Sequence, residues 1–512
     1  MKREVTKKNN RKALTLILIL LGAMTITAAP GDLDLSFGNG GTVSTLIMNI
    51  GHHEQPSSIL VQPDGKILVS GQIDDYGALV SFFLARYNPT GTLDTSFGEN
   101  GKIIDPGGEG EFVGADIALQ PDGKIIAVGI KGDNSSWVVA VNRYNSNGTL
   151  DISFGTGGKV VTTIGNGVDY VTGIALQPDG KIVVVGHEFD SGTVVVVRYN
   201  PGGSLDNSFG VGGLVTTAIG GSVQVHDVLV QPDGKIVAVG SIESSESNSD
   251  FAVVRYNPDG SLDDAFGTGG KVITSILQYD NAFAAVLQPD GKIVAAGSGY
   301  STGAATTIVR YNANGSIDRG FAANGIFTTE WSFFWGTHIA LQPDGKIVAF
   351  GRGTVPVGGS EFAIARLNPN GSLDAGFGIN GRSVTPISAN GCCSYASAGT
   401  IQSDGKILAV GSAGYEPYEI TIARYRGDSK VLVAGRVTTP DGRGLRNATV
   451  SLTDSLGVRR TATTSSFGLF TFDNVRAGEE YVIGVASKRY RFAPRTLTVN
   501  ENLTDVDLVG LE

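Results

Sequence analysis

The stretch LQPDGKIVVVG, Leu176–Gly186, decides the fold, because close copies of it recur along the whole chain. Residues 178–180 have the chemistry of a tight β-hairpin turn. Proline is preset for the second position of a type I turn, aspartate suits the third, and glycine adopts the left-handed conformation that closes the loop. The residues that follow are β-branched and apolar, as in a buried strand. Each copy therefore predicts two antiparallel strands joined by a short turn.

The turn aspartate recurs seven times, 54 to 60 residues apart. A chain with 73 glycines and only 17% charged residues suits many short strands better than helices or disorder. A period near 57 residues is too long for one rung of a β-helix and fits one propeller blade of about four strands. We therefore expect seven blades, each with a structural turn aspartate: Asp64, Asp122, Asp179, Asp233, Asp290, Asp344 and Asp404.

Each repeat has the same order of predicted strands, here called A to D. In the third copy they are residues 172–176, 181–186, 193–199 and 214–217, and the connector LDNSFG, residues 205–210, precedes the last one. Runs such as VVVV in strand C lack polar alternation, so both faces of the strand should be covered. A blade between two neighbouring blades meets that condition.

The two ends of the repeat array complement each other. The chain opens with a connector and a strand D, residues 33–43, before any strand A, and the seventh copy ends after strand C at residues 423–426. The N-terminal strand should therefore complete the last blade and leave no unpaired blade edge. The predicted fold is all-β: a seven-bladed β-propeller closed by the N-terminal strand, followed by a small β-sandwich.

The repeat resembles a known family. Its QPDGK turn, its RYN strand end and its GSLDxxFG connector are similar to the delta-60 repeat, a bacterial repeat regarded as propeller-forming and without an assigned activity. The resemblance covers about residues 31–426 and implies an exported propeller without known catalytic residues. Ser403, in place of the turn proline, and Leu367, in place of the tyrosine after Arg366, depart from the pattern.

After residue 427 the repeat stops and short strands of another pattern follow. Residues 435–452, 467–472 and 477–481 resemble the carboxypeptidase regulatory-like domain, a prealbumin-like sandwich that is an accessory module in its family. None of the five histidines has a glutamate three or four positions later, so a zinc-peptidase ligand set is absent from the sequence. The predicted domains are a signal peptide (1–29), the propeller (30–427) and the sandwich (428–512).

The N-terminus reads as a secretory signal peptide: six basic residues, an apolar run at 13–23 and small residues up to Ala29. We expect cleavage near Ala28 or Ala29 and a secreted, periplasmic or cell-surface protein, and the alternative of an uncleaved membrane anchor stays open. The mature chain has a net charge of −15, from 33 basic and 48 acidic side chains, which makes nucleic acid an unfavourable partner. The two cysteines, Cys392 and Cys393, are adjacent and cannot staple the fold, whether they form a vicinal disulfide or two thiols.

The turn aspartates and two further polar sets recur in every repeat and raise the question of calcium or anion sites. We favour turn capping and arginine–carboxylate pairing, because a feature that every blade needs belongs to the scaffold. We predict no metal and no cofactor. The two sets are the connector aspartates (Asp34, Asp94, Asp151, Asp206, Asp263, Asp318 and Asp374) and the strand C arginines (Arg86, Arg143, Arg198, Arg255, Arg310, Arg366 and Arg424).

The loops at one end of the blades vary between copies, which suits either a ligand surface or unconstrained drift. If strand A is innermost, one residue per blade rings the channel mouth at that end. Amides beside aromatic rings suit a sugar or a peptide, and the alternative is that the aromatics plug the channel or pack between blades. The candidate ligand-binding residues are Gln55, Tyr170, Gln224, Asn281, Trp335 and Tyr395, with Val113 in the same ring and with Trp331, His226 and His338 nearby.

The sequence lacks a GxSxG elbow, a phosphate loop and an HExxH motif. We therefore expect an exported, non-catalytic binding or interaction protein that holds a glycan, peptide or cell-surface partner at the variable face. The alternative is a propeller hydrolase or lyase at the channel mouth. An enzyme needs titratable groups from different blades, such as His226 with Asp169 or Glu54, within hydrogen-bond reach.

Overall fold

The computed structural model describes residues 29–511 apart from short segments, and all regular elements of the described residues are β-strands. The predicted signal peptide up to residue 28, the site candidates Asp169, Trp331 and Trp335, and the two cysteines lie outside the described residues. The omitted segments are 49–52, 75–80, 106–110, 134–135, 165–169, 189–191, 246–247, 302–303, 330–337, 355–358, 388–393, 415–418, 428–429, 455–456, 477–478 and 500–502.

In the described residues the antiparallel strand pairings form groups of four strands, each matching one repeat. One parallel bridge, between Ser249 and Tyr279, joins the fourth and fifth groups into a single eight-stranded sheet. The first four blades are β2 (His53–Val61), β3 (Ile67–Asp74), β4 (Ser81–Tyr87) and β5 (Lys102–Asp105); β6 (Glu111–Leu119), β7 (Ile125–Asp133), β8 (Ser136–Tyr144) and β9 (Lys159–Thr162); β10 (Tyr170–Leu176), β11 (Ile182–Glu188), β12 (Thr193–Tyr199) and β13 (Leu214–Ala218); and β14 (Ser222–Val230), β15 (Ile236–Ser245), β16 (Asn248–Tyr256) and β17 (Lys271–Thr274).

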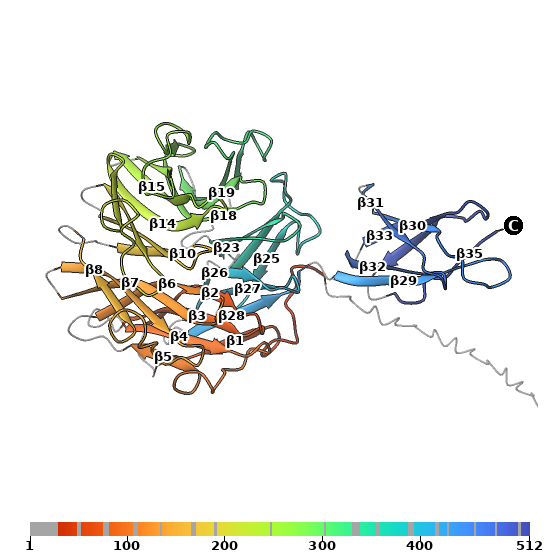
Figure 1. Ribbon diagram of the computed structural model, residues 1–512, viewed down its shortest axis with the longest axis horizontal. Coiled ribbons are helices and arrows are strands. Elements are labelled where there is room, and N and C mark those ends of the chain that lie inside the picture. The colour runs from red at the N-terminus through yellow and green to blue at the C-terminus, as the bar shows by residue number, and fades with distance from the viewer. Residues whose placement is uncertain are drawn as a thin grey trace, which may run out of the picture.

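The remaining three blades follow the same order. They are β18 (Tyr279–Leu287), β19 (Ile293–Tyr300), β20 (Ala304–Tyr311) and β21 (Ile326–Thr329); β22 (His338–Leu341), β23 (Ile347–Thr354), β24 (Ser360–Leu367) and β25 (Arg382–Thr385); and β26 (Tyr395–Ile401), β27 (Ile407–Ala413), β28 (Glu419–Tyr425) and β1 (Thr42–Thr45). The first strands of successive blades touch one another in a closed circuit, from β2 through β6, β10, β14, β18 and β22 to β26 and back to β2. Strand A is therefore the innermost strand, and the blades surround a common axis (Figure 1).

The N-terminal strand closes the ring as predicted. β1 pairs antiparallel with β28, from Thr42 opposite Ala423 to Thr45 opposite Ile420. Even the turn between strands C and D of the last blade is assembled from both ends of the propeller, because Gly31 N donates to Arg426 O and Arg426 N donates to Asp32 O, both at 2.8 Å. In the first blade, Asn88, Gly91 and Thr92 form the equivalent turn within one continuous segment.

In six of the seven blades, the described contacts of the strand C arginine join that blade to the next one. Its Nε binds the connector aspartate of its own blade, at 2.7 Å for Arg198 and Asp206, and its guanidinium lies over the connector phenylalanine, 4.3 to 4.5 Å from the ring centre in all seven blades. Nη1 of Arg198 then donates to Pro258 O of the following blade at 2.6 Å. Nη1 of Arg424 in the last blade does the same to Pro89 O of the first blade, at 2.7 Å. These arginines hold the blades together, in addition to the apolar clusters between successive blades.

The C-terminal residues form two further sheets, with strand orders β32-β29-β35 and β31-β30-β33-β34, around an apolar core of their own. Figure 1 shows them as a unit beside the propeller, and Nη2 of Arg476 donates a hydrogen bond to Oδ2 of Asp344 in a propeller turn at 2.6 Å. No helix of the described residues has the length and apolar character needed to cross a membrane. The strands are β29 (Lys430–Thr438), β30 (Thr449–Thr453), β31 (Arg459–Thr463), β32 (Leu469–Arg476), β33 (Glu479–Ala486), β34 (Arg495–Val499) and β35 (Leu508–Val509).

Candidate functional site at the channel mouth

The first residues of the innermost strands alternate between exposed and buried side chains. In β2, Gln55 and Ser57 are exposed on either side of the buried Pro56, and in β10, Tyr170 is 54% exposed beside the buried Val171. Side chains along a strand point alternately to opposite sides. We infer that the residues seven and five positions before the strand A glutamine face the channel, and we call them the channel-facing positions.

The second channel-facing position carries a β-bulge. In six of the seven innermost strands, the pairing with strand B skips the residue at this position. A bulge leaves one residue out of the ladder and redirects its side chain. The skipped residues are Ser57, Ala115, Thr172, His226, Phe283 and Ser397.

Aromatic rings and imidazoles from three neighbouring blades meet at these positions. Tyr170 stacks on His187 of β11 with ring centroids 5.2 Å apart, and the buried His187 is held in place because its Nδ1 accepts a hydrogen bond from Val225 N at 3.2 Å. The His226 ring meets Phe283 edge to face at 5.1 Å. The exposed Tyr170 ring therefore stacks on a buried imidazole that is itself hydrogen-bonded to the next blade.

His226 is a neutral hydrogen-bonding group at neutral pH. Burial, with a smaller effect of the nearby His187, lowers its pKa to about 4. Its Nε2 is buried and has no hydrogen-bond partner among the described residues. A neutral imidazole has one donor and one acceptor nitrogen, so this ring keeps an unused hydrogen-bonding position.

The other sequence candidates fall into two groups. Gln55 is exposed, and Gln224, Asn281 and Tyr395 are partly buried at the first channel-facing position of their strands. His338 begins β22 and lies 6.2 Å from the ring of Phe350 on the paired strand β23. It is not at a channel-facing position, and burial lowers its pKa to about 4.

Glu54 does not pair with His226. Its side chain is 1% exposed, and its Oε1 accepts the backbone N–H groups of Ile47 at 2.6 Å and Met48 at 2.8 Å, which precede β2 in the chain. Burial raises the pKa of Glu54 to about 7, against the opposing effect of these hydrogen bonds. The carboxyl group therefore caps the connection that follows the closing strand.

Two further carboxyl groups lie on innermost strands and were not predicted from the sequence. Asp227 follows the bulge of β14, and its two oxygens accept Val228 N of its own strand and Ala285 N of the next blade, both at 2.7 Å. Asp116 makes the equivalent pair of hydrogen bonds from β6, at 2.8 Å to Ile117 N and 3.3 Å to Ile174 N. Burial, with the charge of Asp116, raises the pKa of Asp227 to about 7. The sequence feature that could have revealed both groups is an aspartate four positions before the strand A glutamine.

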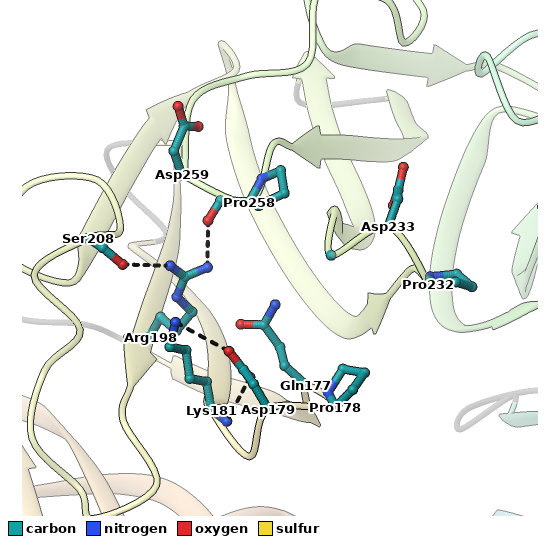
Figure 2. Close-up of a pocket in the computed structure, with 11 residues that line it drawn as sticks. Gln177, Pro178, Asp179, Lys181, Arg198, Ser208, Pro232, Asp233, Pro258 and Asp259 are labelled. Atoms are coloured by element: carbon teal, nitrogen blue, oxygen red, sulfur yellow. Dashed lines mark hydrogen bonds and ion pairs between the residues drawn. The ribbon is translucent and has the colours of Figure 1, made fainter.

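A cavity of about 540 Å³ lies between the third and fourth blades, at the end of the blades that carries the recurring turns between strands A and B (Figure 2). Arg198 and Lys181 line it, but Arg198 binds Asp206, Ser208 and Pro258 O, and Lys181 lies 3.3 Å from both Asp179 and Asp206. Its cationic groups are thus occupied by contacts within the third blade and by the bond from Arg198 to Pro258 O of the fourth. Across the part of the chain that the structure describes, no three histidine, cysteine or acidic side chains are grouped to hold a metal ion.

Comparison with protein families gives two matches. A beta-propeller family described as a domain of unknown function, DUF5122, matches residues 62–97, 120–154, 177–209, 231–266, 288–321 and 342–377. The carboxypeptidase regulatory-like domain matches residues 433–509. The seventh repeat has no match of its own, and its four strands come from opposite ends of the chain.

Among curated proteins nothing matches. Among solved structures, this chain is similar to a protein of unknown function from Dyadobacter fermentans (11% identity, 76% of this chain and 99% of that one, TM-score 0.39). It is also similar to the polysaccharide lyase Uly1 (11% identity, 79% and 98%, TM-score 0.43) and to a gluconolactonase from Xanthomonas campestris (11% identity, 67% and 90%, TM-score 0.34). Likenesses this distant say nothing about the activity of this chain.

Proposed function

We propose that the protein is an exported, non-catalytic binding protein. Its repeats match the DUF5122 beta-propeller family, and its C-terminal residues match the carboxypeptidase regulatory-like domain. Its ligand is a glycan or a peptide held at the channel mouth on the variable-loop face. The C-terminal sandwich serves as a spacer or a second binding module. Export rests on the basic, apolar and small-residue pattern of residues 1–29.

The observation that carries the proposal is the exposed, oriented ring of Tyr170. An aromatic side chain that is 54% exposed and stacked on a buried imidazole is a ready platform for the apolar face of a sugar or for a peptide side chain. Hydrogen-bonding groups flank it on the next blade, where Gln224 and His226 occupy the channel-facing positions of β14. An apolar face beside a few polar groups is the usual composition of a small-ligand site.

The geometry favours binding over catalysis. Oε1 of Glu54 accepts hydrogen bonds from the backbone of residues 47 and 48. Both carboxylate oxygens of Asp227 accept hydrogen bonds from backbone N–H groups. His187 and His226 are a pair of titratable groups from different blades, and Nδ1 of His187 already accepts a hydrogen bond from Val225 N. General acid–base catalysis needs a free acid and a free base on either side of a substrate.

The test is binding of the mature chain, residues 30–512, to arrays of glycans and peptides, followed by calorimetry on each hit. We expect Tyr170→Ala to weaken binding by about 3- to 10-fold, the effect of about 0.5–1.5 kcal/mol for one aromatic contact. Phe467→Ala is the matched control, because Phe467 is another exposed aromatic, 70% exposed, in the C-terminal module. Equal affinity in the wild type and Tyr170→Ala, or turnover of a bound glycan, would contradict the proposal.

A further inference from the structure

A buried acidic pair lies where the fourth and fifth blades meet. Asp280 of β18 is fully buried and Asp250 of β16 is 7% exposed. A parallel bridge pairs Ser249 with Tyr279, the residues that precede the two aspartates. Residues that lie opposite each other on neighbouring strands project from the same face of the sheet. The two carboxyl groups are therefore neighbours, and the charge of Asp250 adds to the effect of burial in raising the pKa of Asp280.

The protein leaves part of this pair unsatisfied. Oδ2 of Asp280 accepts the N–H groups of Ile276 at 2.8 Å and Leu277 at 2.6 Å. Oδ1 of Asp280 and Oδ1 of Asp250, however, are buried without a hydrogen-bond partner among the described residues. Burying a carboxylate without a donor or a counter-charge is costly.

A third unsatisfied oxygen faces the same place. Thr307 of β20 is fully buried, and its Oγ1 also has no hydrogen-bond partner within the described part of the chain. A Cβ atom added to Gly299 would lie 2.7 Å from Oδ1 of Asp280, 2.9 Å from Oγ1 of Thr307 and 2.6 Å from Cδ1 of Leu277, so the two oxygens and one methyl group surround one point. Gly299 pairs with Asp280, and an isoleucine in its place would fill the position of these oxygens.

The repeat does not require this cluster. At the junction of the third and fourth blades, the residues equivalent to the two aspartates are Thr193 and Val223, and the residue equivalent to Gly299 is the buried Ile242. The scaffold therefore forms without two buried acids and a glycine at such a junction.

At the junction of the seventh and first blades the equivalent residues are also acidic, Glu419 and the buried Glu54. There, however, Ile73 and Phe83 stand where the fifth blade has Gly299 and Thr307. The glycine and the threonine beside the acidic pair therefore set the junction of the fourth and fifth blades apart.

We propose that the junction of the fourth and fifth blades binds a divalent cation of the calcium type through Asp250, Asp280 and Thr307. Hard cations take carboxylate and hydroxyl oxygens, completed by backbone carbonyl and water oxygens. The cation neutralises the two carboxylates and gives each unsatisfied oxygen a partner. Asp250, which keeps a small exposed fraction, marks the side of entry.

The experiment is calorimetric titration of the mature chain with Ca²⁺ after removal of metals with EGTA, with melting curves in parallel. We expect saturable binding of one Ca²⁺ per chain. Ca²⁺ at about 100 times its Kd should shift the unfolding equilibrium about 100-fold, or about 2.7 kcal/mol. Mg²⁺ should bind more weakly, because it demands a small octahedral site and loses its water reluctantly.

Three variants make the result specific. Asp250→Asn and Thr307→Val, which leave the hydrogen bonds of Asp280 to Ile276 and Leu277 in place, should each weaken Ca²⁺ binding at least tenfold. Asp227→Asn, the control, changes a carboxyl group of β14 outside the cluster and should bind Ca²⁺ like the wild type. The proposal is overturned if the folded wild type takes up no Ca²⁺, or if Asp250→Asn binds it unchanged. It is also overturned if Asp250→Asn is more stable than the wild type at pH 8 with no effect of Ca²⁺, because the pair then holds a shared proton.

Discussion

Ring closure by the N-terminal segment can be measured with two matched phenylalanines. Phe37 belongs to the segment before β1, and Phe209 belongs to the continuous third blade; both are fully buried. The guanidinium of Arg424 lies 4.5 Å from the ring centre of Phe37, and that of Arg198 lies 4.4 Å from the ring centre of Phe209. The two sites differ only in how the chain reaches them.

If the closing segment is as firmly held as an internal blade, Phe37→Ala and Phe209→Ala should cost the same free energy of unfolding. Truncation of a buried phenylalanine costs about 3–5 kcal/mol, or about two to four orders of magnitude in the unfolding equilibrium. A frayed terminus would instead make Phe37→Ala nearly silent, at under about 0.5 kcal/mol. Urea unfolding of both variants, followed by intrinsic fluorescence, gives the comparison. A silent Phe37→Ala beside a destabilising Phe209→Ala would refute the closed ring.

Two other changes test the same molecule. Deleting residues 30–47 removes β1 and should lower the melting temperature and promote self-association through the edge of β28, as light scattering would detect; an unchanged melting curve would count against closure. Asp227→Asn addresses pH. Because the folded pKa of Asp227, about 7, exceeds its ordinary value of 3.8, the stability that this carboxyl contributes is full below pH 4, declines as the pH rises toward 7 and is lost above it. Urea midpoints at pH 5 and pH 8 should therefore differ less in Asp227→Asn than in the wild type, and an identical pH dependence would exclude this role.

The sequence predicted the parts of the fold that local chemistry determines. The turn glycines, such as Gly180 with φ +82°, adopt the left-handed conformation that the turn requires. The closing strand was predictable because the two chain ends lack complementary parts of one repeat. The contacts of the strand C arginines with carbonyls of the next blade were not, because those contacts join residues about 60 positions apart and depend on how blades stack.

The channel mouth was predictable in outline and not in detail. Counting from the strand A glutamine placed Tyr170 in the correct strand, but its partner His187 lies on strand B, and nothing in the sequence pairs the two residues. The bulge at His226 shifts the register by one residue, and a periodicity of two does not detect such a shift. For the same reason the sequence did not reveal that Asp116 and Asp227 bind the backbone of the following blade.

Residues that break the repeat are the best guide to function in such a protein. Every blade needs its turn, its connector and a contact with the next blade. The turn aspartates, the connector aspartates and the strand C arginines recur for this reason, and their contacts are structural. His187 and His226 occur once each at their positions, in the third and fourth blades, whereas Tyr170 has a counterpart in Tyr395. The pair of Asp250 and Asp280 has an acidic counterpart in Glu419 and Glu54, but only the fourth and fifth blades add Thr307 and Gly299 to it. Asp280 is adjacent in β18 to Asn281 at the channel mouth. A cation that fixes Asp280 would therefore also hold the strand that carries Asn281 and Phe283.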